Sequence, residues 1–211
     1  MGFEMKPPRV ASGGTKIDFG AFVAPMVLPG DYTVKLKVGD KEYTKTLKLI
    51  HDSKNKDFTI ADRQLQYRTS LQLYNLHERL AATVDSINAK QKLLRMNISK
   101  IKDTVSKKLL QDYVTKLEEL RSTLLATKQK SIFADEKKLR EEITDVYAAV
   151  AGQEAAPSNL QLQRAAQLQE KEAKAEESRV TLAKQFETKV NDALAKEGLP
   201  LKDEGKPAKA F

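Results

Sequence analysis

Two histidines and one glycine-rich stretch are the first residues whose types suggest chemistry. His51 and Asp52 are adjacent and could act as a general base and its orienting carboxylate, but no nucleophile occurs in a matching context. We interpret this pair as part of a polar linker. His77 lies among leucines at helical spacing, which predicts a position at the boundary of a helical core. The stretch 13–16, GGTK, is similar in composition to a phosphate-binding loop but lacks the flanking strand and helix.

Adjacent glutamates occur at Glu118-Glu119 and at Glu141-Glu142. Carboxylate pairs hydrolyse glycosides, but neighbours on a helix diverge by about 100° and face solvent. The chain has no Cys and two His, which excludes thiol catalysis and metal sites made of cysteines or several histidines. No nucleotide-binding, serine-hydrolase or metalloprotease motif occurs. We predict no catalytic, cofactor-binding or metal-binding residue, no cofactor, and no enzymatic activity of this chain alone.

Charge is distributed unevenly along the 211 residues, whose formal net charge is +8. Residues 58–133 contain 14 basic and 7 acidic side chains. A basic surface binds nucleic acid or anionic lipid, but interleaved acids and a lack of aromatic stacking residues favour a solvated helical face. The basic residues that stand out are Arg95, Lys100, Lys102, Lys107 and Lys108. We expect partial neutralisation by acidic residues of the later helices: Asp135, Glu136, Glu141, Glu142, Glu170 and Glu172.

Glycine and proline are absent between Asp40 and Ala151, which favours long helices there. Before this stretch, residues 31–38 and 42–50 alternate between apolar and polar types around Gly39-Asp40, a pattern that predicts a β-hairpin with a type II′ turn. A lone hairpin is marginal in water, so we expect further short strands as cover. The candidates for that cover are Phe3, Met5, Ile17, Phe19, Phe22 and Val23.

Apolar spacing of three and four residues predicts four helices. The first begins near Thr59, and the second carries the leucines of 109–125. Residues 97–99 and Asp103 are the two local candidates for a turn between them, and the boundary of these two helices stays open. The third begins by Ala134-Asp135 and ends at Gly152, and the fourth runs from the cap Ser158 to Gly198. Burial of the last two helices is expected through Leu139, Ile143, Tyr147, Leu182, Phe186 and Val190.

These elements predict an α+β fold that is mainly α. A small partial β unit (1–52, with the hairpin at 31–50) packs on the base of a long antiparallel three- or four-helix bundle (53–198). Residues 199–211 form a flexible C-terminal tail. No apolar run reaches about 18 residues, so we predict no membrane span, and no signal peptide follows Met1.

The sequence LPGDYTVKLKVGDKEYTKTLKL (28–49) resembles the "APGTYTVRLTVGGKTYTQPLTV" hairpin. That hairpin ends the Ig-like segment of bacterial sortilin-like, BNR-repeat β-propeller proteins, which are often labelled glycosyl hydrolases. The ending VNDALAKEGLPL (190–201) is similar to the family's "LNALLREAGLPPL", and MKPP (5–8) resembles the edge "WDLRYPPP" without its Trp. The helical segments between them follow the family's order. The propeller itself, with its Ser-x-Asp-x-Gly-x-x-Trp boxes, does not occur in this sequence.

This resemblance implies a non-catalytic accessory and interaction module, the C-terminal part of a secreted sortilin-like protein. It also implies an extracytoplasmic location and a protein partner, either separate or the chain's own upstream propeller. The first alternative is part of a carbohydrate-active or peptidase enzyme whose catalytic residues lie in the missing propeller. The second alternative is a basic coiled-coil adaptor that binds nucleic acid, although we expect no specific nucleic-acid binding. The oligomeric state stays open.

Overall fold

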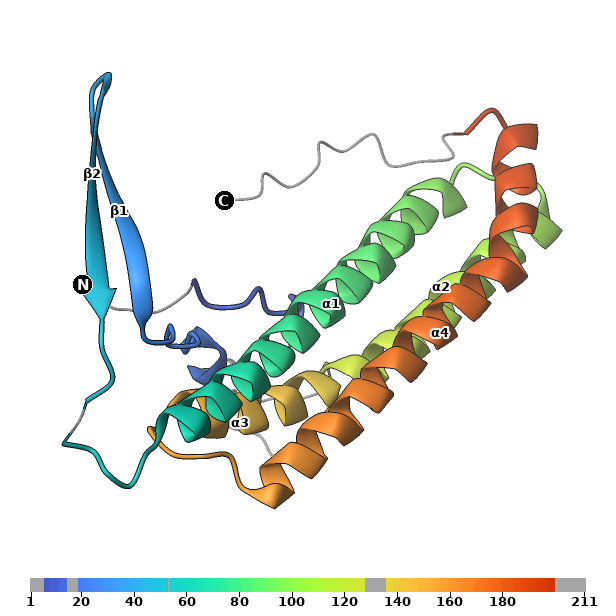
Figure 1. Cartoon of the computed structure of the whole chain (residues 1–211). Coiled ribbons are helices and arrows are strands. Elements are labelled where there is room, and N and C mark those ends of the chain that lie inside the picture. The colour runs from blue at the N-terminus through green and yellow to red at the C-terminus, as the bar shows by residue number, and fades with distance from the viewer. Residues whose placement is uncertain (1–5, 15–18, 53, 128–135, 200–211) are drawn as a thin grey trace.

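A computed structural model describes residues 6–14, 19–52, 54–127 and 136–199 (Figure 1). The elements are the 3-10 helix η1 (Phe19–Phe22), strands β1 (Gly30–Val38) and β2 (Lys41–Leu49), and helices α1 (Ile60–Ile98), α2 (Thr104–Leu124), α3 (Leu139–Ala151) and α4 (Asn159–Lys196). The described chain is therefore mainly α with one two-stranded antiparallel sheet, which confirms the predicted fold class. The predicted tail lies almost wholly outside the described residues, which end at Leu199.

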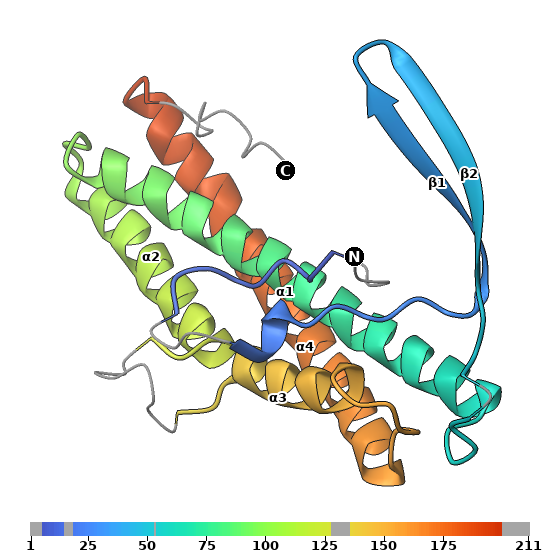
Figure 2. The ribbon, with the colours of Figure 1, turned by 90° about the vertical axis from the view of Figure 1, so that its left-hand side faces the viewer.

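Helices α2 and α3 both run antiparallel to α1, whereas α1 and α4 run parallel. Hydrogen bonds join Gln72 to Gln169 and Arg79 to Glu172, so the residue numbers rise together along the two helices. Helices α2 and α3 run in the same direction and pack against different parts of α1 (Figures 1 and 2). The predicted antiparallel bundle thus becomes three rows of helix, one of which consists of α2 followed by α3.

Local capping signals set the beginnings of the helices. Thr59 and Asp62 form a capping box at the start of α1, and Asp103 accepts the Ser106 backbone N–H at 2.8 Å at the start of α2. Ser158 forms a further box at the start of α4. These caps confirm the predicted starts of α1 and α4. Of the two candidates for the turn between the first two helices, Asp103 is the residue that caps α2.

A glycine lies at or just after the end of both α3 and α4. Helix α3 ends at Gly152 as predicted, and the chain after α4 turns at Gly198 (φ +64°). The start of α3 differs from the prediction at Ala134-Asp135, which lies outside the described residues. The segment 136–138 is not helical, and α3 begins only at Leu139.

The core is centred on one apolar stripe of α1. The stripe consists of Leu73, Leu76, Leu80, Val84, Ile87 and Leu94, each at most 1% exposed. Leu139, Ile143, Tyr147 and Val190 join it as predicted. Leu182 and Phe186 are only partly buried, and Val105 is 78% exposed although it fits the apolar spacing. The turn at 99–103 separates Val105 from the stripe of α1, so its face of α2 points to solvent.

Residues 6–14 and 19–27, here called the N-terminal strap, lie along the bundle and not beside the hairpin (Figure 2). Ala11 is part of the bundle core, η1 packs against α3, and the Tyr147 hydroxyl donates to the Val23 carbonyl at 2.8 Å. We expected these residues to supply strands that cover the hairpin. That expectation is wrong for Phe19, Phe22 and Val23, while Phe3, Met5 and Ile17 lie outside the described residues.

The hairpin forms with the predicted register and turn. Tyr32 lies opposite Leu47, and Leu36 lies opposite Tyr43. Gly39 has φ +60° and no described non-glycine residue has a positive φ, which fits a type II′ turn with glycine first. Neither strand packs against a helix anywhere in the described chain, so the expected docking of the β unit on the bundle base does not occur (Figure 1).

The stacked pair Tyr113 and Phe186 provides a test of the bundle core. Their rings are 4.7 Å apart with an interplanar angle of 4°, and Tyr113 is 2% exposed. We expect Tyr113→Ala to lower the free energy of unfolding by about 3–5 kcal/mol, and Phe186→Ala by about 2 kcal/mol because that ring is only partly buried. The control Lys107→Ala should stay within about 0.5 kcal/mol. Urea unfolding followed by circular dichroism measures all three; a Tyr113→Ala variant as stable as the parent contradicts this core.

Candidate functional site

His51 and Asp52 make separate contacts within the connection between β2 and α1. His51 Nε2 lies 2.7 Å from the Phe58 carbonyl oxygen, and the Asp52 carboxylate accepts the Lys54 backbone N–H at 2.9 Å. Both contacts hold the connection between β2 and α1. The prediction of a polar linker is confirmed.

His77 is buried in the bundle, so its predicted position at the core boundary is wrong. Its side chain is inaccessible, its ring packs edge-on against Tyr147 at 5.7 Å, and its Nε2 lies 3.4 Å from Thr144 Oγ1. Its Nδ1 has no hydrogen-bond partner in the described structure. Burial, reinforced by the nearby Arg140, lowers the pKa of His77 to about 4. The ring is therefore a neutral core side chain at neutral pH.

Arg140 and Glu141 form a buried ion pair beneath the strap. Arg140 Nη2 lies 2.6 Å from Glu141 Oε1, and the two side chains are 4% and 0% exposed. Glu141 also accepts the Lys138 backbone N–H at 3.1 Å, while Arg140 donates to the Ala11 carbonyl at 3.0 Å. We expected Glu141 to face solvent. The expectation is wrong because the strap covers this turn of α3.

The two glycines of the GGTK stretch lie in the strap, next to arginine side chains of α2 and α3. The Gly13 carbonyl accepts a hydrogen bond from Arg121 at 3.2 Å. A Cβ at Gly14 would meet the Arg140 guanidinium, so a larger residue here would require the Arg140 side chain to shift. Thr15 and Lys16 lie outside the described residues. In the described part, the glycines receive arginine side chains of the protein itself.

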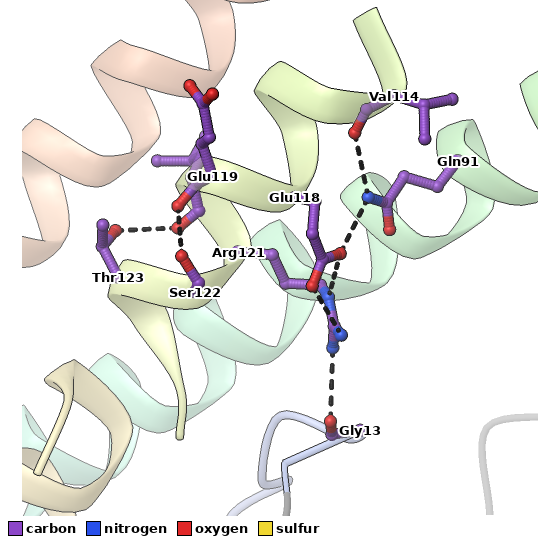
Figure 3. A network of polar contacts seen from close by, with 9 residues as sticks. Gly13, Gln91, Val114, Glu118, Glu119, Arg121, Ser122 and Thr123 are labelled. Carbon is purple, nitrogen blue, oxygen red and sulfur yellow. Dashed lines mark hydrogen bonds and ion pairs between the residues drawn. The ribbon is translucent and has the colours of Figure 1, made fainter. Parts of the chain in front are cut away.

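Glu118 and Glu119 both form contacts within the bundle (Figure 3). Glu118 accepts hydrogen bonds from Gln91 of α1 and from Arg121, both at 3.0 Å. Partial burial opposes ionisation of Glu118, but these hydrogen bonds outweigh it and lower its pKa. Glu119 pairs with Lys116 at 2.8 Å. The two carboxylates point to different partners and do not converge on one site.

The acidic residues expected to neutralise the basic helices do so only in part. Glu172 pairs with Arg79 of α1 at 3.0 Å, as expected. Glu142 pairs instead with Lys171 of α4, and Glu136 pairs with Lys138. Asp135 lies outside the described residues. Most of the charge on 92–108 therefore stays on the surface.

The exposed apolar face of the hairpin is the strongest candidate for a functional site. Tyr32, Val34, Leu36, Val38, Tyr43 and Leu47 share this face with two lysines, Lys45 opposite Val34 and Lys41 opposite Val38. Leu36 is 59% exposed and Tyr43 is 54% exposed, and no other described element covers them. Exposed apolar side chains that gather on one face of an element are candidates for an interaction site. We call this surface the hairpin face.

The opposite face of the hairpin is polar. Thr33 lies opposite Thr46, and Lys35 forms a 2.9 Å ion pair with Glu42. Lysines along the strands discourage uncontrolled edge-to-edge pairing. The hairpin therefore has one polar side and one side on which exposed apolar residues gather around Lys41 and Lys45.

Comparisons with protein-family models, with curated proteins and with solved structures found no match. Among the described residues, no group of three or more His, Cys, Asp or Glu is placed to hold a metal ion. Within the same ranges, no helix is both long and apolar enough to cross a membrane.

The buried His77 gives the protein a specific pH response. The unfolded chain takes up a proton near pH 6.5, whereas the folded ring does so only near its pKa of about 4. Stability is therefore lost as the pH falls from 6.5 to 4, by about 3 kcal/mol in total. We expect His77→Gln to remove most of this loss and the control His51→Gln to retain it. Urea unfolding at several pH values measures the loss, and an unchanged pH slope in His77→Gln contradicts the assignment.

Proposed function

We propose that this chain is a non-catalytic accessory and interaction module, the C-terminal part of an exported sortilin-like β-propeller protein. The observation that carries the proposal is the uncovered hairpin face, since a two-stranded hairpin needs cover to be stable. The same hairpin carries the sequence resemblance to the Ig-like segment of those proteins. An extracytoplasmic location belongs to this proposal.

The size of the hairpin face favours a partner in the same polypeptide. Two strands of nine residues cover roughly 30 Å by 10 Å, or about 300 Å². A stable interface between separate proteins buries about 800 Å² on each side. Covalent linkage raises the effective concentration and allows a small apolar face to remain covered. The preferred partner is therefore a β structure upstream in the same protein, with a separate protein as the alternative.

The polar residues of this chain support a structural role over a catalytic one. Arg140, Glu141, Glu118 and Arg121 are committed to contacts within the bundle or with the strap. A carbohydrate-active or peptidase function would place its catalytic residues in a propeller outside this chain.

The test uses the polypeptide encoded upstream of Met1 in the same reading frame, produced separately, and measures its affinity for this chain by calorimetry. We expect Leu36→Ser/Tyr43→Ser to weaken binding by more than about tenfold, the equivalent of 1.4 kcal/mol. The free energy of unfolding of this chain should change by less than about 0.5 kcal/mol, because both side chains are exposed.

The matched control is Thr33→Ala/Thr46→Ala on the polar face, which should bind like the parent. Equal binding by the Leu36→Ser/Tyr43→Ser variant contradicts the role of the hairpin face. Turnover of a glycoside by this chain alone contradicts the non-catalytic assignment. A stop codon directly upstream of Met1 favours an independent adaptor instead.

A further inference from the structure

The segment in which α1 ends and α2 begins is strongly basic. We call residues 92–108 the basic tip. Its cationic residues are Lys92, Arg95, Lys100, Lys102, Lys107 and Lys108. Asp103 is the single acidic residue of this range, which gives a formal net charge of +5. All six cationic residues are exposed.

The basic tip also exposes aliphatic side chains on a firmly held scaffold. Val105 is 78% exposed and Met96 is 48% exposed. Between them, Ile101 is 4% exposed and belongs to the bundle core, and Asp103 caps α2. The exposed aliphatic side chains therefore lie on the last turn of α1 and the first turn of α2, on either side of a connection that Ile101 anchors in the core.

We propose that the basic tip binds peripherally to the surface of an anionic lipid membrane. Its lysines and arginine would lie at the phosphate-containing headgroups, where each cation strengthens binding severalfold. Val105 and Met96 would enter the boundary between headgroups and acyl chains, as apolar residues of interfacial helices do. Long lysine side chains reach the headgroups while their stems cover apolar surface.

A membrane surface fits the basic tip better than nucleic acid does. Residues 92–108 contain no aromatic side chain on which a base could stack. Exposed valine and methionine bring little to a phosphate backbone but favour transfer into a lipid interface. The inference does not depend on what covers the hairpin face.

The position of the basic tip allows both surfaces to be occupied together. Helix α1 has 39 residues and therefore spans about 58 Å. The hairpin joins the chain near the start of α1, and the basic tip is at its other end (Figures 1 and 2). A membrane at the basic tip leaves the root of the hairpin at the far end of the bundle.

The experiment is cosedimentation of the whole chain with phosphatidylcholine vesicles, with and without about one third phosphatidylserine. We expect binding to the anionic vesicles only. Lys100→Gln/Lys102→Gln/Lys107→Gln should weaken it by more than about tenfold. The matched control Lys41→Gln/Lys45→Gln/Lys48→Gln removes the same charge from the hairpin and should change binding by less than about twofold.

A fourth variant, Val105→Ser, separates insertion from simple charge attraction. It should keep the helical content of the parent and lose the binding that persists when salt screens the charges. No binding to anionic vesicles overturns the proposal, as does equal loss in the two triple variants. Tighter binding of duplex DNA than of anionic vesicles also overturns it and assigns the basic tip to nucleic acid.

Discussion

The apolar stripe of α1 is the constraint on which the rest of the structure depends. Helix α1 has 39 residues, whereas α2 has 21, so an antiparallel α2 covers only the far part of the stripe. Helix α3 covers the near part, as its contact between Thr144 and His77 shows, and α4 with 38 residues follows the whole length. Because α2 and α3 both run antiparallel to α1, α4 returns in the direction of α1.

The sequence predicted the features whose signals are local. The caps at Thr59 and Ser158 and the hairpin turn each lie within four residues of their partners, so composition and spacing reveal them. The buried contacts of Arg140 could not be predicted from local sequence signals. Arg140 reaches Ala11 across 129 positions of the chain, and apolar periodicity carries no information on such contacts. The alternation of apolar and polar residues predicted the hairpin face. It did not predict that the strap packs against α3 and leaves this face uncovered.

Hydrogen bonds from the bundle hold the chain just before β1, whereas the two strands themselves do not pack against a helix in the described chain. Tyr147 and Arg63 donate to the Val23 and Val27 carbonyls at 2.8 Å and 3.3 Å, just before β1 begins. A Cβ at Gly20 would lie 2.9 Å from Thr144 Cγ2, so the strap sits close against α3. The bundle and strap bury their own apolar surface, whereas the hairpin does not. This contrast is the physical basis for our proposal that the hairpin face binds a partner.

Native-state amide hydrogen exchange tests this contrast most directly. Protection reports how far each segment depends on global unfolding. We expect amides near Leu76 and Leu80 to exchange only through global unfolding, and amides of β1 and β2 to exchange orders of magnitude faster in the isolated chain. Protection of β1 and β2 equal to that of α1 would contradict the claim that the hairpin lacks its cover.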